Sequence, residues 1–373
     1  MQQHFDASGT VKGFANALQT LASQEDVQAI LVLACDDNGW TPRAVDPCLK
    51  ASHVPVLGGV FPQIAYKGAN YRQGTLLVGL NSAPSIGVVE GLSAEQTQFE
   101  EALADLAATW PEDAGPQTYF VVVDGLASRI SAFVESLFFT FGLEHNFIGG
   151  GAGSLSFVQR PCLITPTGLK EDAALVARLP MPSVIGVAHG WKPISDAFTV
   201  TSSERNVVKS IDWEPAADIY ARMIKAHSGQ QISADNFFSI AKSYPLGIAR
   251  LDAELIVRDP LMMNAQGEIT CVGEVPEGCR VTLLHGNPGT LMGAAACAHR
   301  QATAHLAPGA QADLLLIDCI SRVLFLDNMI THELKEVSKG QSVFGAFTLG
   351  EIANSGSDYL AFYNKTVVLG ALG

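Results

Sequence analysis

Charged side chains set within apolar runs are the residues of this sequence best suited to orient a ligand. Burying an unpaired charge is costly, so each of these groups must be paired or face a cavity. One interpretation is a set of arginine–carboxylate bridges that only stabilise the fold. The other is a pocket in which the same groups orient a ligand. The candidate ligand-binding residues are Arg258, Asp259, Cys319, Arg322 and Glu351.

Histidine and cysteine spacings do not indicate a local metal site. None of the nine histidines forms a His-x-x-x-His pair, and there are no paired Cys-x-x-Cys motifs. A single axial ligand to a haem iron needs no spacing motif, however, because one histidine facing an apolar pocket suffices. The seven cysteines are odd in number and lie mostly in apolar segments, which favours buried thiols in a reducing compartment.

Motifs of common enzyme classes are also missing from the sequence. The glycine-rich run 149–154 lacks the Gly-Lys-Ser/Thr ending of a Walker loop, and we expect it to form a tight strand connection. There is no Gly-x-Ser-x-Gly elbow. The sequence does not exclude a catalytic Cys-His dyad, because the two residues of a dyad can be distant in sequence. An enzyme is therefore kept as an alternative class of function.

The composition of the chain limits the class of ligand and indicates where in the cell the protein works. With 48% hydrophobic residues and 16% charged residues, the chain does not resemble a disordered protein. A net charge of −14 without a Lys/Arg cluster argues against nucleic acid. The apolar runs are far shorter than the roughly 20 residues of a spanning helix, so we expect no membrane insertion. The N-terminus lacks a secretory signal pattern, which favours a cytoplasmic protein.

A pattern repeated three times along the chain predicts the architecture. Each copy is an apolar strand ending in an acid or thiol, then a helical stretch, then an apolar pair followed by small residues. The copies begin at Leu31, Phe120 and Leu314, and 22 to 27 positions separate the acid from the first glycine after the later apolar pair. Such a gap accommodates one helix with its turns. Strands without polar alternation are covered on both faces.

The predicted fold class is therefore α/β, with layered mixed β-sheets flanked by helices and with internally repeated strand-helix-glycine-turn-strand units. Residues 269–272 and 280–284 flank a turn-forming run and are expected to form a hairpin. The polar stretch 228–236 is the best candidate for a division into halves 1–227 and 228–373. We expect the helices listed here: 94–107, 128–141, 215–225 and 290–305.

Several stretches of the chain resemble the FIST family, a sensory module of prokaryotic (bacterial) signalling proteins with N-terminal and C-terminal halves. The resemblance rests on stretches that occur in the family's order along nearly the whole chain. They are Phe147 to Gly153, Ala188-His189-Gly190-Trp191-Lys192-Pro193, Ser210 to Ala216, Pro245-Leu246-Gly247, Ile256 to Pro260, Asp318 to Arg322, Phe347 to Ile352 and Tyr363-Asn364-Lys365-Thr366. In place of the family's common Gly-Cys-Ser/Thr run, this chain has Gly58 to Ile64, with Phe61 and Gln63.

The resemblance implies signal transduction by a small-molecule or gas ligand. Free-standing FIST proteins of this size resemble the nitric-oxide-sensing haemoproteins called NosP, which implies haem b as cofactor and a two-component partner. That partner would be a sensor histidine kinase or a cyclic-di-GMP enzyme acting in trans, with a homo-oligomer left open. For the axial metal ligand we favour His189 ahead of His332 and His145, with Phe61 near the cofactor. The alternative is a haem-free sensor of an amino-acid-like metabolite, in which Arg258 and Glu351 orient charged groups.

Overall fold

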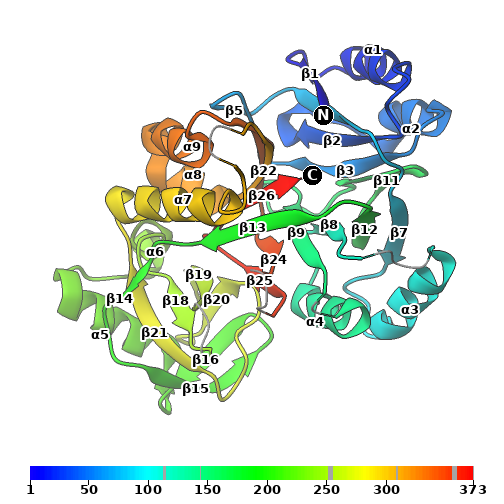
Figure 1. The fold of residues 1–373 in the computed structure, drawn as a ribbon. Helices are drawn as coiled ribbons and strands as arrows, with labels where there is room; N and C mark the ends of the chain where they lie inside the picture. The colour runs from blue at the N-terminus through cyan, green and yellow to red at the C-terminus, as the bar shows by residue number, and fades with distance from the viewer. Residues whose placement is uncertain (112–114, 143, 251–254, 308–309, 355–358, 373) are drawn as a thin grey trace.

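The computed structural model describes residues 1–111, 115–142, 144–250, 255–307, 310–354 and 359–372. Over these residues the chain is a mixed α/β protein whose strands form four sheets (Figure 1). Three sheets have related topologies and surround a common core, while the fourth is formed by a continuous segment, residues 190–287. The predicted fold class is confirmed. In the described part of the chain no helix is both long and apolar enough to span a bilayer.

The first sheet has the strand order β1, β6, β2, β3, β10, β11. Its strands are β1 (Gln2–Asp6), β2 (Ala29–Cys35), β3 (Val56–Phe61), β6 (Thr75–Leu80), β10 (Leu163–Thr165) and β11 (Gly168–Lys170). Helix α1 (Val11–Ala22) begins at Thr10, whose side chain accepts from the Gly13 amide and so satisfies one open donor of the first turn. Helix α2 (Pro42–Ala51) lies between the parallel strands β2 and β3 in the chain.

The second and third sheets repeat this plan. The second has the order β25, β24, β9, β8, β12, β7, and the third has the order β13, β26, β22, β23, β4, β5. The strands of the second are β7 (Ser85–Glu90), β8 (Thr118–Asp124), β9 (Asn146–Ala152), β12 (Ala173–Leu179), β24 (Glu351–Ala353) and β25 (Ala361–Tyr363). Those of the third are β4 (Gln63–Tyr66), β5 (Ala69–Tyr71), β13 (Ser183–Ala188), β22 (Asp313–Cys319), β23 (Ser342–Thr348) and β26 (Val367–Leu372).

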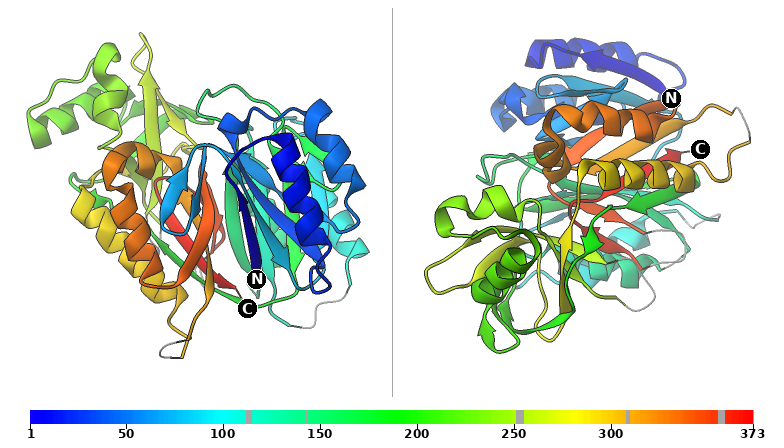
Figure 2. Two further views of the ribbon diagram at one scale, coloured as in Figure 1. Left: turned by 90° about the horizontal axis from the view of Figure 1, so that it is seen from above. Right: turned by 90° about the vertical axis from the view of Figure 1, so that its left-hand side faces the viewer.

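The predicted repeat is confirmed, because each copy supplies one parallel strand pair: β2 with β3, β8 with β9, and β22 with β23. The helices α3 (Phe99–Thr109), α4 (Ile130–Phe141) and α7 (Pro288–Ala302) overlap the expected ranges. In the third unit α8 (Ile320–Leu326) and α9 (Ile330–Ser338) separate the parallel strands. Figure 2 shows these helices on the outside of the sheets.

Each unit also gives a strand pair to a neighbouring sheet. The chain leaves β3 and enters β4, which pairs with β23 so that Gln63 lies opposite Phe347. In the same way β10 leaves the second unit to pair with β3, and β24 leaves the third unit to pair with β9. The exchange is cyclic, with the first unit giving to the third, the second to the first, and the third to the second.

One glycine in each parallel pair is required by this close approach of backbones. A Cβ added to Gly58, Gly149 or Gly345 would overlap the carbonyl oxygen of the residue opposite it in the neighbouring strand. Gly149, Gly150 and Gly151 therefore belong to strand β9, and the connection expected at 149–154 begins only at Gly153. The side chains of Leu31, Phe120 and Leu315, one from each unit, meet in the buried core between the sheets.

The fourth sheet closes on itself. Its order is β14, β21, β15, β16, β20, β19, β18, and β18 also pairs with β21, which completes a barrel. The strands are β14 (Lys192–Pro193), β15 (Phe198–Glu204), β16 (Val207–Ile211), β17 (Glu214–Pro215), β18 (Leu246–Ile248), β19 (Ile256–Met263), β20 (Ile269–Val272) and β21 (Arg280–His285). The hairpin expected between β20 and β21 is wrong, because the edges of β20 pair with β16 and β19, and those of β21 with β15 and β18.

Two helices complete this inserted segment. Helix α5 (Ala216–Ser228) packs beside β16, and the short helix α6 (Phe237–Ala241) packs beside β19. The stretch 228–236, where we expect a division into halves, lies between α5 and α6. Figure 1 shows the barrel and these helices as a lobe beside the three core sheets.

Candidate functional site

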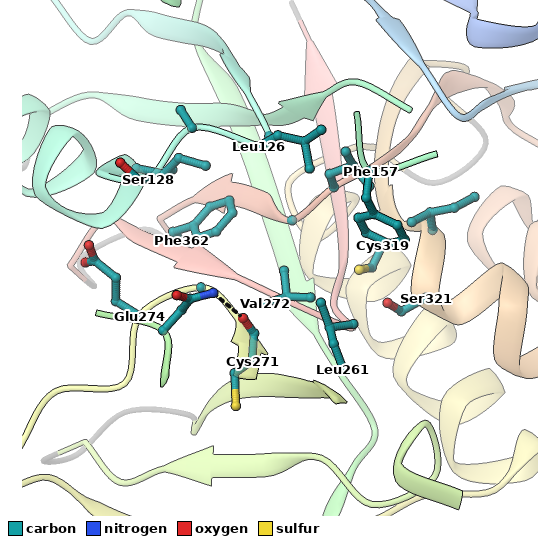
Figure 3. Close-up of a pocket in the computed structure, with 18 of the residues that line it drawn as sticks. Leu126, Ser128, Phe157, Leu261, Cys271, Val272, Glu274, Cys319, Ser321 and Phe362 are labelled. Atoms are coloured by element: carbon teal, nitrogen blue, oxygen red, sulfur yellow. Dashed lines mark hydrogen bonds between the residues drawn. The ribbon is translucent and has the colours of Figure 1, made fainter. Parts of the chain in front are cut away.

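The carboxyl ends of β8 and β22 point toward the barrel, and a cavity of about 300 Å³ lies there. We call it the site cavity and define it by its main walls: Leu126 and Ser131 after β8, Val272 of the barrel, and Ile320 and Leu349 of the third unit. Crevices at the carboxyl ends of parallel strands are the usual ligand sites of α/β sheets. Figure 3 shows side chains from all three parts surrounding the space.

The lining is mostly apolar with a few polar groups. Leu126, Leu261, Val272 and Phe362 point into the space in Figure 3. Polar contributions come from serine hydroxyls and from Asn206, whose amide donates to the Cys271 carbonyl over 2.9 Å. A concave apolar pocket with a few convergent polar groups is typical of small-molecule sites.

An elongated loop covers one side of the site cavity. The links from β3 to β4 and from β23 to β24 are short turns, whereas the corresponding link from β9 to β10 spans residues 153–162. Phe157 of this loop lines the cavity although 54% of it is exposed, and its φ of 54° is unusual for a bulky residue. Strained residues of this kind persist at ligand sites when surrounding contacts hold them.

Two polar side chains anchor this loop. The guanidinium of Arg160 donates to Asp36 over 2.6 Å and to Ser154 over 2.7 Å. The amide of Gln159 donates to Asp124, the last residue of β8, over 2.8 Å. The loop that carries Phe157 is therefore tied to the first unit through Asp36 and to the second unit through Asp124.

A buried ion pair lies directly behind the cavity wall. Lys365 is within 3.1 Å of Asp259, and both side chains are at least 98% buried. The Ser321 hydroxyl, which lines the cavity, donates to Asp259 over 2.8 Å. Asp259 thus fixes a cavity hydroxyl instead of facing a ligand itself.

A second buried charge cluster joins β22 to α9. Arg322 lies within 3.2 Å of Asp318 and donates to Glu333, and all three side chains are fully buried. Arg322 also donates to the carbonyl oxygens listed here: His189, Lys365 and Leu291. Burial and the neighbouring Glu333 raise the pKa of Asp318 well above its usual range. These contacts support the structural interpretation for Arg322.

Glu351 lies in a third buried position, at the start of β24. Its carboxylate accepts from the Thr348 hydroxyl over 3.0 Å and from the Thr366 amide over 3.2 Å. Burial raises the pKa of Glu351 to about 8, although those hydrogen bonds and the Cys319 thiol oppose the shift. Glu351 is not among the residues that line the site cavity.

Cys319 is the one of the five candidate ligand-binding residues whose side chain lines the site cavity. Burial and then the neighbouring Glu351 raise the pKa of its thiol well above the usual range. The group is therefore a neutral thiol at physiological pH and a poor nucleophile. Its place in the wall makes it a packing and weakly polar contact.

Arg258 lines a separate, more open cavity of about 370 Å³ beside α4. Its guanidinium donates to the Glu274 carbonyl over 2.8 Å and to the Phe362 carbonyl over 3.0 Å. Burial lowers the pKa of Arg258 to about 10, so the side chain stays charged. It joins the barrel to strand β25 through these backbone contacts.

None of the three candidate haem ligands lines the site cavity. His189 is buried, its Nδ1 accepts from the Trp191 amide over 2.9 Å, and burial lowers its pKa to about 3. His145 is buried against Tyr119, and His332 is exposed on α9. Phe61 is buried in the core at the end of β3.

Sequence reasoning did not assign several residues that build this site. Leu126, Phe157, Val272 and Phe362 come from distant segments, and periodicity along the chain carries no signal that joins them. Lys365 could have been found from the sequence, because a charged residue next to an apolar strand indicates a buried charge. Among the described residues, no three His, Cys, Asp or Glu side chains gather closely enough to hold a metal ion.

Comparison with protein families identifies the class. The FIST N domain matches residues 29–214, and the FIST C domain matches residues 216–354. The chain therefore belongs to the FIST family, whose domains are sensory, ligand-binding modules of signalling proteins. No curated protein matches the chain significantly. The boundary between the two matches falls beside β17, inside the barrel segment, and each match contains strands of more than one sheet.

Proposed function

We propose that this protein senses a small molecule bound in the site cavity. The observation that carries the proposal is the place of the cavity, where the second unit, the third unit and the barrel meet. A ligand there contacts all three parts at once. It shifts their balance between two arrangements if it binds one of them more tightly.

The partner in this proposal is a separate signalling enzyme, a sensor histidine kinase or a cyclic-di-GMP enzyme. Support for it comes from the family resemblance of the sequence. The ligand-bound and ligand-free forms would then differ in their effect on the partner's activity. The measurement is the partner's activity with and without this protein, each at saturating ligand and without ligand.

The family resemblance of the sequence implies a more specific function, haem-based nitric oxide sensing, but the site cavity does not fit a haem. A b-type haem requires an axial side chain, and His189, His145 and His332 all lie away from the cavity walls. The cysteines in the wall offer no ready thiolate, since burial raises the pKa of Cys271 to about 12 and that of Cys319 still further. We therefore place no haem in this cavity.

The experiment that tests the function separates these cases. Protein expressed with ample haem supply is purified, reduced and exposed to nitric oxide while its visible spectrum is recorded. We expect no stoichiometric Soret band, and a small-molecule library screened by thermal shift to raise the melting temperature. A stoichiometric band that shifts with nitric oxide, and that is lost in a His189→Leu variant that still folds, would overturn the haem-free assignment.

A second variant tests the location. Leu126→Trp adds bulk to the cavity wall, so it should abolish the thermal shift by any ligand that binds there. The matched control is Met329→Trp, because Met329 does not line the cavity and is 40% exposed, which leaves the larger ring room in solvent. Ligand shifts that survive Leu126→Trp would show that the ligand binds elsewhere.

A further inference from the structure

Two charged side chains line the site cavity, Arg205 and Glu274, and neither of them is buried. Arg205 lines the cavity, but its guanidinium is half exposed and pairs with Glu95 over 3.0 Å. The buried charges Asp259 and Lys365 pair with each other behind the wall. An amino acid zwitterion would leave its ammonium or its carboxylate without a buried partner, which is costly.

The size of the cavity sets the size of the ligand. At about 300 Å³ it has about twice the roughly 150 Å³ of an apolar cavity that takes up benzene. A fused bicyclic ring or a short acyl chain fits this space. Leu126, Leu261, Val272, Ile320, Leu349 and Phe362 supply apolar contacts for such a body.

Three serines line the wall, and the hydroxyls of Ser131 and Ser321 have hydrogen-bonding capacity left for a ligand. The Ser131 Oγ is buried and has no hydrogen-bond partner among the described residues, so it is able to donate or accept. The Ser321 hydroxyl gives its proton to Asp259, which leaves its lone pairs to accept. A ligand hydroxyl both donates and accepts, and so it suits this pair.

We infer that the ligand is an uncharged lipophile, a bicyclic aromatic or a short-chain compound, that carries a hydroxyl group. This inference rests on the proposed function, because it names the ligand class of the same site. The apolar body fills the space between the second unit, the third unit and the barrel, while Ser131 binds the ligand hydroxyl. Phe157 covers the ligand from the elongated loop.

The test compares probes of one shape and different polarity. Equilibrium dialysis measures the binding of 2-naphthol, naphthalene, 2-naphthoate and L-phenylalanine to the full-length protein. We expect 2-naphthol to bind at least tenfold more tightly than 2-naphthoate or L-phenylalanine. Ser131→Ala should weaken 2-naphthol binding about fivefold, the effect of one neutral hydrogen bond, and leave naphthalene binding unchanged.

Ser82→Ala is the matched control, because the Ser82 Oγ is also buried without a partner in the described residues but lies outside the cavity wall. It should leave the binding of every probe unchanged. Tighter binding of 2-naphthoate or L-phenylalanine that Leu126→Trp abolishes would overturn the ligand class and keep the sensory site. Binding of 2-naphthol that Leu126→Trp leaves intact would instead overturn the site itself, and with it the proposed function.

Discussion

Replacing Arg322 by methionine tests whether the buried charge cluster stabilises the fold. Arg322 is fully buried, pairs with Asp318 and Glu333, and donates to three backbone carbonyls. Removing one partner of such a cluster leaves the other charges uncompensated, which costs about 3–5 kcal/mol. Because three carbonyls also lose their donor, we expect the upper end, about 5 kcal/mol. That is a large share of the roughly 5–15 kcal/mol by which domains are stable.

The assay is urea unfolding followed by the fluorescence of the four tryptophans, of which Trp191 is buried near this cluster. The double variant Arg322→Met/Glu333→Gln removes one stranded carboxylate, so it should recover about 1–2 kcal/mol relative to Arg322→Met. Arg222→Met is the control, because Arg222 and Glu214 form an ion pair that is more than half exposed and worth at most about 1 kcal/mol. A loss below about 1 kcal/mol for Arg322→Met would refute the reasoning.

Three further changes have signs fixed by the structure. The pKa of Glu351 is about 8 in the folded protein, whereas it is ordinary in the unfolded chain. The unfolded chain therefore loses this proton first, and stability should fall as pH rises from about 4.5 to 8. In urea unfolding, the Glu351→Gln variant should show a smaller fall. The pKa of His189 is about 3 in the folded protein, so the unfolded chain binds a proton on this histidine first as pH drops. Stability should therefore fall as pH drops from about 6.5 to 3. The fall should be smaller in a His189→Leu variant that still folds. Thermal unfolding should show that Gly345→Ala destabilises the protein by about 3 kcal/mol, because the added Cβ overlaps the Leu316 carbonyl. Gly293→Ala should instead stabilise it by about 0.5–1 kcal/mol, because Gly293 lies in an open position of α7. Unchanged pH profiles, or equal effects of the two glycine variants, would contradict these assignments.

The sequence predicted the local parts of this fold well. The three apolar strands, the strand that follows each of them and the positions of α3, α4, α5 and α7 follow from patterns that span fewer than 30 residues. The exchange of strands did not follow, because Gln63 pairs with Phe347 and no local pattern indicates a partner so distant. The hairpin at β20 and β21 failed for the same reason, since barrel closure assigns their edges to other strands.

The candidate site was predicted in part. The embedded charges were found because they interrupt apolar runs, but a run does not show whether its charge faces a cavity or another charge. Arg322 faces Asp318 and Glu333, and Asp259 faces Lys365. Cys319 lines the cavity, yet the apolar walls around it have no signature that distinguishes them from core. The haem ligands proposed from the resemblance lie outside the cavity walls, and the visible spectrum tests whether any of them binds haem.

The cyclic strand exchange constrains the order in which this protein is able to fold during its synthesis. When β4 leaves the ribosome, its partner β23 is still untranslated, and β9 likewise waits for β24. The nascent chain therefore carries open strand edges, a template for aggregation, until almost its whole length has emerged. Completion of the fold is thus a late event, which makes protection of the growing chain by a chaperone valuable to this architecture.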